Sequence, residues 1–65
     1  MGKTYSSREI IEQLKADNWY LDNVAGDHHQ FKHLTKKGRV TVQHPRKTLS
    51  KHVVASIARQ SGLKF

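Results

Sequence analysis

The sequence predicts an α+β fold in which a helix, a three-stranded antiparallel sheet and a second helix follow one another. Apolar residues recur at helical spacing near both ends of the chain, and short runs of strand-forming residues, bounded by turn residues, lie between them. A chain of 65 residues is expected to form one domain, residues 1–65, with a thin core. Both helices are expected on one face of the sheet, where their apolar sides share this core, and the opposite face is expected to stay open.

The first helix is predicted at residues 7–17. Ser6 and Glu9 have the spacing of a capping box, in which each side chain binds a free backbone N–H group at the start of a helix. Glu9 near the start and Lys15 near the end also suit the helix dipole. The apolar side of this helix would be formed by Ile10, Ile11 and Leu14.

Three strands are predicted, at residues 19–24, 28–34 and 39–43. Turn residues separate them at positions 25–27 and 35–38, and each turn contains a glycine. Pro45 ends the third strand because proline cannot donate a hydrogen bond to a neighbouring strand. In the first strand we expect Trp19 in the core and Tyr20 on the opposite face, where it could contact RNA or a protein partner.

The second helix is predicted to begin after Ser50 and to end at Gly62, which can adopt the left-handed conformation of a C-cap. Leu49 and Val54 are spaced for a hydrophobic staple across the start of this helix. Its apolar stripe would consist of Val53, Val54, Ile57 and Ala58.

Charge is divided unequally along the chain. Residues 1–27 contain all five acidic residues and three Lys/Arg, whereas residues 28–65 contain nine Lys/Arg, all five histidines and no acidic residue. The net charge is therefore −2 for the first segment and +9 for the second, which gives the total of +7. A basic surface that carries histidines indicates a polyphosphate, such as a nucleic acid, as the partner.

Size and composition exclude several classes of function. A domain this small has no room for a deep cavity, which favours a polymer bound on an open face over an enclosed small molecule. The absence of cysteine excludes disulfides and thiolate metal sites. The sequence has no apolar run suited to a signal peptide or a membrane span, so we expect a cytoplasmic protein that does not enter a membrane.

His28 is the candidate catalytic residue. Side chains alternate along a strand, and Phe31 is the best candidate for the core in the second strand. His29 and His33 would then share the side of Phe31, and His28 would project from the open face. This inference assumes that no β-bulge interrupts residues 26–31. The other residues expected on the open face are Gln30, Lys32, Arg39, Thr41 and Gln43.

A single exposed histidine among cations suits RNA cleavage, because RNA supplies its own nucleophile, the 2′-hydroxyl group, and needs no metal ion or cofactor. His28 would be the general base that removes the proton of this group. Lys32, Arg39 or Arg46 would stabilise the charge on the phosphorane, and the products would carry 2′,3′-cyclic phosphate and 5′-hydroxyl ends. In the alternative interpretation, His28 is a polar residue beside a turn and has no catalytic role.

Five segments of the sequence carry a further signal: Gly26-Asp27-His28-His29-Gln30-Phe31, Val40-Thr41-Val42-Gln43-His44-Pro45, Ile57-Ala58-Arg59-Gln60-Ser61-Gly62-Leu63, Ser7-Arg8-Glu9-Ile10-Ile11 and Asn18-Trp19. In their order and spacing these segments resemble the HicA toxin family over nearly the whole chain. The resemblance implies a fold like that of double-stranded-RNA-binding domains, mRNA interferase activity and a HicB-like antitoxin as partner. We expect the free toxin to be monomeric and to form a hetero-oligomer with the antitoxin.

The resemblance also bears on the candidate catalytic residue. In the family pattern a histidine directly after a small hydroxyl residue is catalytic, and this position corresponds to His28. Asp27 replaces the hydroxyl residue here. This replacement could act in either of two ways, because a neighbouring carboxylate could orient the histidine or could repel the scissile phosphate.

Two rival interpretations belong to other functional classes. The first is a non-catalytic module that binds double-stranded RNA through its shape, phosphates and 2′-hydroxyl groups. The second is a metal site formed by His28, His29, His33 and His44, since imidazole is a common ligand of zinc, copper and nickel. Strand spacing argues against the metal site, because His29 and His33 would converge on one ion only in a helix. We therefore expect no metal and no cofactor.

The predicted RNA-binding residues are cations of the basic segment. Clusters of cations are often only solvated turns, but no carboxylate follows Asp27 to neutralise these. They are therefore expected to supply most of the affinity for RNA. The predicted set is Lys32, Lys36, Lys37, Arg39, Arg46 and Lys47.

Overall fold

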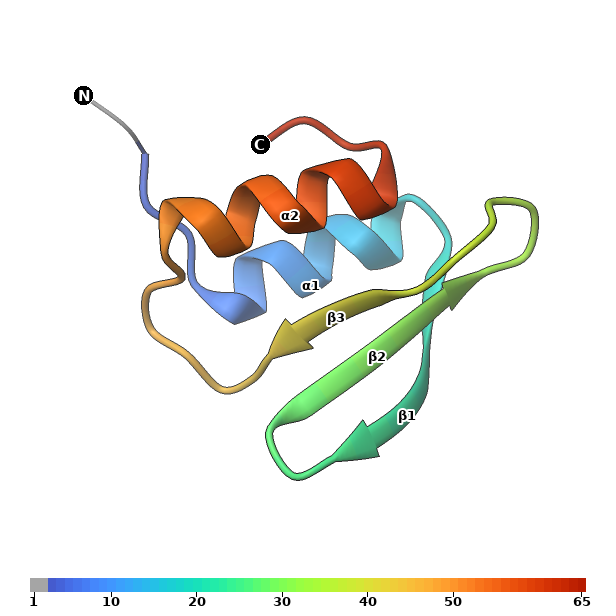
Figure 1. The fold of residues 1–65 in the computed structure, drawn as a ribbon, viewed down its shortest axis with the longest axis horizontal. Coiled ribbons are helices and arrows are strands. Elements are labelled where there is room, and N and C mark those ends of the chain that lie inside the picture. Colours follow the sequence, from blue (N-terminus) through green and yellow to red (C-terminus); the bar gives the residue numbers. More distant parts are fainter. Residues whose placement is uncertain (1–2) are drawn as a thin grey trace.

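The computed structural model describes residues 3–65 and confirms the predicted order of helix, three antiparallel strands and helix. The elements are α1 (Ser7–Ala16), β1 (Trp19–Ala25), β2 (His28–His33), β3 (Val40–Gln43) and α2 (Lys51–Ser61). The strands form one sheet in the order β1-β2-β3, so β2 is central. In the view of Figure 1 both helices lie above the sheet. Each predicted strand boundary lies within one residue of the observed boundary.

Helix α1 begins with the predicted capping box. The Ser6 hydroxyl accepts a hydrogen bond of 3.1 Å from Glu9 N, and the Glu9 carboxylate accepts one of 2.9 Å from Ser6 N. The bond from Ser6 N favours the charged carboxylate and lowers the pKa of Glu9. After the helix, Asn18 adopts the left-handed conformation with φ of 72°, which asparagine tolerates better than most residues. The chain is thereby redirected into β1.

The strand register decides which side chains share a face. Phe31 of β2 lies opposite Leu21 of β1 and Val40 of β3. A bulge is present, but it lies in β1 between Leu21 and Asn23, and the pairing of β2 is continuous from His28 onward. The alternation predicted for β2 is therefore intact, with Phe31 buried and His28 exposed.

The core lies between the sheet and the helices. Helix α1 contacts β1 and β3, and α2 contacts β3. Trp19 is 2% exposed, which confirms its predicted place in the core, whereas Tyr20 is 45% exposed. Residues of both helices and of the sheet therefore contribute to one common core. The buried apolar residues are Ile10, Leu14, Trp19, Phe31, Val40, Val42, Leu49 and Ile57.

Helix α2 has the predicted caps at both ends. The Ser50 hydroxyl accepts a hydrogen bond of 3.2 Å from Val53 N at the start. Gly62 has φ of 76° at the end, where its N–H donates to the Ala58 carbonyl oxygen at 2.9 Å. In the part of the chain that the structure describes, no helix is long and apolar enough to cross a membrane.

Candidate functional site

His28 lies at the start of β2 on the open face of the sheet. It is paired with Ala25 of β1 and Gln43 of β3, and its side chain is 51% exposed. Phe31, three positions further along the strand, is 1% exposed and points to the opposite side. The imidazole therefore lies where a polymer bound to the open face can reach it.

The imidazole of His28 contacts the carboxylate of the preceding residue. His28 Nδ1 lies 2.9 Å from Asp27 Oδ1, and the Asp27 side chain is 46% exposed. At this distance the charge of the carboxylate acts directly on Nδ1, and Nε2 is the ring nitrogen left for contact with a bound polymer. The sequence indicated that the two residues are neighbours but not that their side chains are in contact.

Arg46 approaches the other oxygen of the same carboxylate. Arg46 Nη2 lies 3.5 Å from Asp27 Oδ2. The two segments are joined by a backbone hydrogen bond of 2.8 Å from His44 N to the Asp27 carbonyl oxygen. The turn before β2 and the loop after β3 therefore meet beside His28.

A buried serine of α1 fixes the loop that carries Arg46. Ser7 is 1% exposed, and its hydroxyl accepts a hydrogen bond of 2.8 Å from Arg46 N. The Ser7 N–H donates to the Arg46 carbonyl oxygen at 2.9 Å, and Ser7 Oγ lies 2.7 Å from His44 Nδ1. Sequence reasoning missed this role, because the two segments are far apart in the chain and neither carries a motif for the contact.

Two of the predicted RNA-binding residues lie on the open face with His28. Arg39 Nη1 donates a hydrogen bond of 2.9 Å to Gln30 Oε1, and Gln30 is two positions from His28 in β2. Lys32 follows two positions later, and its Nζ lies 3.8 Å from Asp22 Oδ2. The structure therefore brings an amide and two cations into one row with the imidazole.

Three other predicted cations, Lys37, Arg46 and Lys47, lie outside this row. Arg46 and Lys47 line a groove between the start of α1 and the loop after β3, together with Arg8. Lys37 is exposed in the connection between β2 and β3. The sequence did not single out Arg8, which comes close to Arg46 only through the Ser7 contacts.

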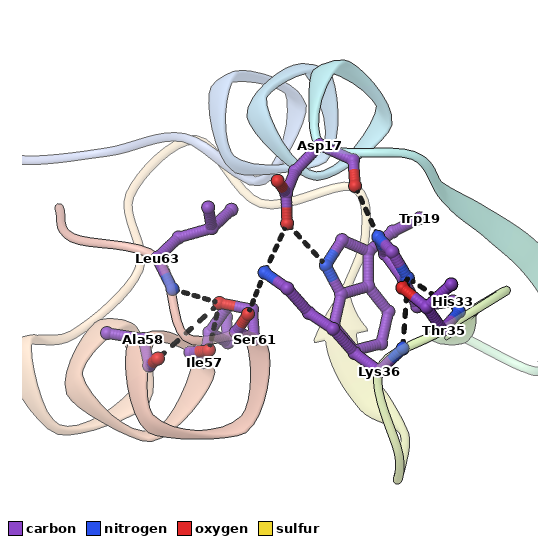
Figure 2. Close-up of polar contacts among 9 residues, drawn as sticks. All are labelled: Asp17, Trp19, His33, Thr35, Lys36, Ile57, Ala58, Ser61 and Leu63. Atoms are coloured by element: carbon purple, nitrogen blue, oxygen red, sulfur yellow. Dashed lines mark hydrogen bonds and ion pairs between the residues drawn. The ribbon is translucent and has the colours of Figure 1, made fainter.

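Lys36 differs from the other predicted cations, because it is bound within the protein. Figure 2 shows its ammonium group between the Asp17 carboxylate and the end of α2. Lys36 Nζ lies 2.6 Å from Asp17 Oδ2 and 3.0 Å from the Ser61 carbonyl oxygen. The hydrogen bond from Lys36 lowers the pKa of Asp17, and a bond from Trp19 Nε1 adds to this effect. Lys36 thus ties the β2–β3 connection to the ends of both helices.

His33 is bonded in the same region, as Figure 2 also shows. Its Nδ1 accepts hydrogen bonds of 3.1 Å from Thr35 N and from Lys36 N. Its Nε2 lies 2.6 Å from the Asp17 carbonyl oxygen, which can only accept, so Nε2 carries the proton. Both ring nitrogens of His33 are therefore used to hold the connection in place.

His29 and His44 form a separate pair on the core side of the sheet. Their rings meet edge to face with centroids 5.0 Å apart, and His29 Nδ1 is buried without a hydrogen-bond partner in the described chain. Among residues 3–65, no group of three or more His, Asp or Glu side chains is arranged to hold a metal ion. The four histidines of the alternative metal site are thus not brought together.

Two comparisons with known proteins bear on this site. A family model described as the HicA toxin of bacterial toxin–antitoxin systems matches residues 7–63, which include every element of the fold and every candidate residue named above. A comparison with the sequences of curated proteins gave no match.

Proposed function

This chain belongs to the HicA toxin family of bacterial toxin–antitoxin systems, and on that premise we propose that it is a ribonuclease that cleaves mRNA without a metal ion. The observation that carries the proposal is the geometry of His28. Its ring is half exposed on the open face, and its Nδ1 faces the Asp27 carboxylate at 2.9 Å, which leaves Nε2 for the substrate. Nε2 is therefore the nitrogen that serves as a base toward a bound ribose.

The proposed reaction needs only the RNA, the imidazole and water. His28 Nε2 takes the proton of the 2′-hydroxyl group while the 2′-oxygen attacks the adjacent phosphorus atom. The bond from phosphorus to the 5′-oxygen breaks, and this oxygen takes a proton from solvent water. The products are a 2′,3′-cyclic phosphate and a 5′-hydroxyl end, and the imidazolium returns its proton to solvent. A positioned base of this kind contributes roughly 10²- to 10⁴-fold to a rate.

Cations around the imidazole supply the binding of the phosphate backbone in this proposal. Lys32 and Arg39 lie in the same row as His28 on the sheet, Arg46 contacts the Asp27 carboxylate next to His28, and Lys47 follows Arg46 on the loop after β3. The guanidinium group of Arg39 or Arg46 would stabilise the extra charge on phosphorus as the reaction proceeds. Lys37 would extend the contact along the backbone.

Lys36 remains in the proposed RNA-binding set, but its test differs from the others. Its ammonium group already binds Asp17 and the Ser61 carbonyl oxygen. A substitution at Lys36 therefore changes the stability of the fold as well as the charge offered to RNA, and stability has to be measured beside affinity for this residue.

The proposal is tested by incubating the purified protein with RNA in excess EDTA. We expect cleavage to continue at an undiminished rate, because no step uses a metal ion. The new 3′ ends should resist a ligase that requires a free 3′-hydroxyl group, and the new 5′ ends should accept phosphate from a polynucleotide kinase. If cleavage is lost in EDTA and is restored by added Mg²⁺, the proposed mechanism is wrong.

A second expected result concerns the affinity for RNA. Charge reversal at the exposed residues Lys37 or Lys47 should weaken binding to all RNA sequences similarly. Each lost phosphate contact should reduce the slope of log affinity against log salt by roughly 0.7 to 0.9. The measurement is a salt titration of fluorescence anisotropy with a labelled RNA.

The matched control for this titration is Lys64→Glu, which makes the same change of charge at an exposed residue outside the proposed set. An equal loss of slope in Lys64→Glu would mean that only total charge matters. In that case the proposed contact surface would be wrong, whereas the cleavage proposal would still be tested separately.

Membership of a toxin–antitoxin family implies an antitoxin as the partner. We propose that a HicB-like antitoxin covers the open face and presents acidic groups to the cations around His28, since charge complementarity speeds encounter and excludes RNA. The free toxin is then a monomer that becomes part of a hetero-oligomer, and it acts on mRNA in the cytoplasm. Competition between antitoxin and labelled RNA for the protein tests this arrangement.

A further inference from the structure

We infer that Asp27 is a positioning residue that holds the His28 imidazole in the tautomer with Nε2 unprotonated. The inference rests on the proposed function, since it assigns a role in the same reaction to a second side chain. Asp27 does not touch the reacting atoms in this arrangement. It acts through the ring that it orients.

The first step of the argument is the contact itself. His28 Nδ1 and Asp27 Oδ1 are 2.9 Å apart. A carboxylate oxygen at this distance attracts a protonated nitrogen and repels an unprotonated one, so we expect the proton of the neutral ring on Nδ1 and its lone pair on Nε2. A ring with the other tautomer would lose the contact and present Nε2–H to the ribose, where a donor cannot remove a proton.

The second step is that Asp27 is itself held in place. Its carbonyl oxygen accepts a hydrogen bond of 2.8 Å from His44 N, so the turn is fixed to the end of β3. Gly26, directly before it, has φ of +60°, a conformation that glycine adopts readily and that reverses the chain between β1 and β2. The carboxylate is therefore presented to the ring by a defined backbone.

The third step concerns the charge of the carboxylate. A bare anion beside the catalytic ring would repel the scissile phosphate, but Asp27 Oδ2 faces Arg46 Nη2 at 3.5 Å. Arg46 is anchored by the buried Ser7, whose hydroxyl and N–H bond to the Arg46 backbone at 2.8 Å and 2.9 Å. One oxygen orients the imidazole and the other is paired with a cation, so orientation is obtained without an unpaired negative charge.

The experiment compares Asp27→Asn with the wild type by kinetics and by NMR. The neutral amide can donate to Nδ1, which favours the opposite tautomer. We expect kcat to fall by roughly tenfold, well below the roughly 10⁴-fold loss seen when a buried aspartate that orients a catalytic histidine becomes asparagine, because this pair is half exposed. KM should stay within about twofold, since RNA binding depends on other residues.

The NMR measurement follows the two ring nitrogens of His28 in the protein without RNA, through long-range couplings between carbon-bound protons and nitrogen. The wild type should show a protonated Nδ1 and an unprotonated Nε2 at a pH where the ring is neutral, and Asp27→Asn should shift this balance toward the other tautomer. Glu12→Gln is the control, because it removes the same charge from an exposed residue of α1. It should change neither kcat nor the His28 signals.

The outcomes separate this inference from the proposed function. If the wild type does not cleave RNA, the proposed function fails, while the tautomer measurement still decides whether Asp27 orients the ring. If the wild type cleaves RNA but Asp27→Asn has an unchanged tautomer or an equal or higher kcat, the positioning role is overturned. A rise in kcat would show that repulsion of the phosphate is the main effect of the carboxylate.

Discussion

Replacing His28 with alanine should reduce RNA cleavage by roughly 10²- to 10⁴-fold, which is the usual contribution of a positioned general base. The fold should be retained, because the side chain is 51% exposed and lies on the face of the sheet opposite the core. Growth inhibition by the expressed protein should be lost together with the cleavage, since both depend on the same proton transfer.

The measurement is the initial rate of cleavage of a fluorogenic RNA in EDTA, together with the thermal unfolding temperature of each variant. His52→Ala is the matched control, because it removes an exposed imidazole from the first turn of α2, away from the strands. It should leave the rate within about twofold of the wild type. Added imidazole should restore part of the activity of His28→Ala, because the missing base is then supplied from solution.

Retained cleavage in His28→Ala would remove the proposed base. Loss of cleavage with a large fall in unfolding temperature would instead assign a structural role to the residue. If the protein is instead a non-catalytic RNA-binding module, the wild type would leave RNA intact. Neither variant would then change the affinity for RNA, because this affinity depends on the cations.

The other histidines of the strands and loops show why His28 is the candidate. Both nitrogens of His33 hold the β2–β3 connection, with bonds to the backbone of Thr35, Lys36 and Asp17. His44 is bonded to the buried Ser7, and His29 packs against it on the core side. These contacts are structural, and the alternation of β2 keeps His29 and His33 off the open face.

The fold was predictable because its signals are local. Ser6 and Glu9 mark the start of α1 with a capping box, and Gly62 marks the end of α2 with a left-handed C-cap. The face of His28 was also predictable, since it depends on the alternation from a single buried aromatic, Phe31. The bulge does not disturb this prediction, because its extra residue lies in β1, whereas Phe31 and His28 both lie in β2.

The surroundings of the site were not predictable, because they depend on contacts between distant segments. Ser7 and Arg46 are 39 positions apart, and no sequence pattern relates a serine in the first turn of one helix to a loop after the last strand. The pairing of Lys36 with Asp17 is another case, since a lysine in a basic turn has the same sequence appearance whether it is solvated or bound. Local patterns decide on which face of the sheet His28 lies, whereas long-range packing decides which groups surround it.

Replacing Phe31 with alanine should have the largest effect on stability. Phe31 is 1% exposed at the centre of the sheet, opposite Leu21 and Val40, and removal of a buried phenyl group costs about 3 to 5 kcal/mol. A domain of this size has a total stability of roughly 3 to 10 kcal/mol. The unfolding temperature should therefore fall by at least about 12 °C, and cleavage should disappear as the protein unfolds.

Leu34→Ala is the control for this change, because Leu34 is 84% exposed just after β2. Its loss should alter stability by no more than about 0.5 kcal/mol. The comparison also tests the site, since the orientation of His28 was derived from the burial of Phe31. If Phe31→Ala unfolds within a few degrees of the wild type, the phenyl group is not in the core. The alternation that directs His28 to the open face would then lose its basis.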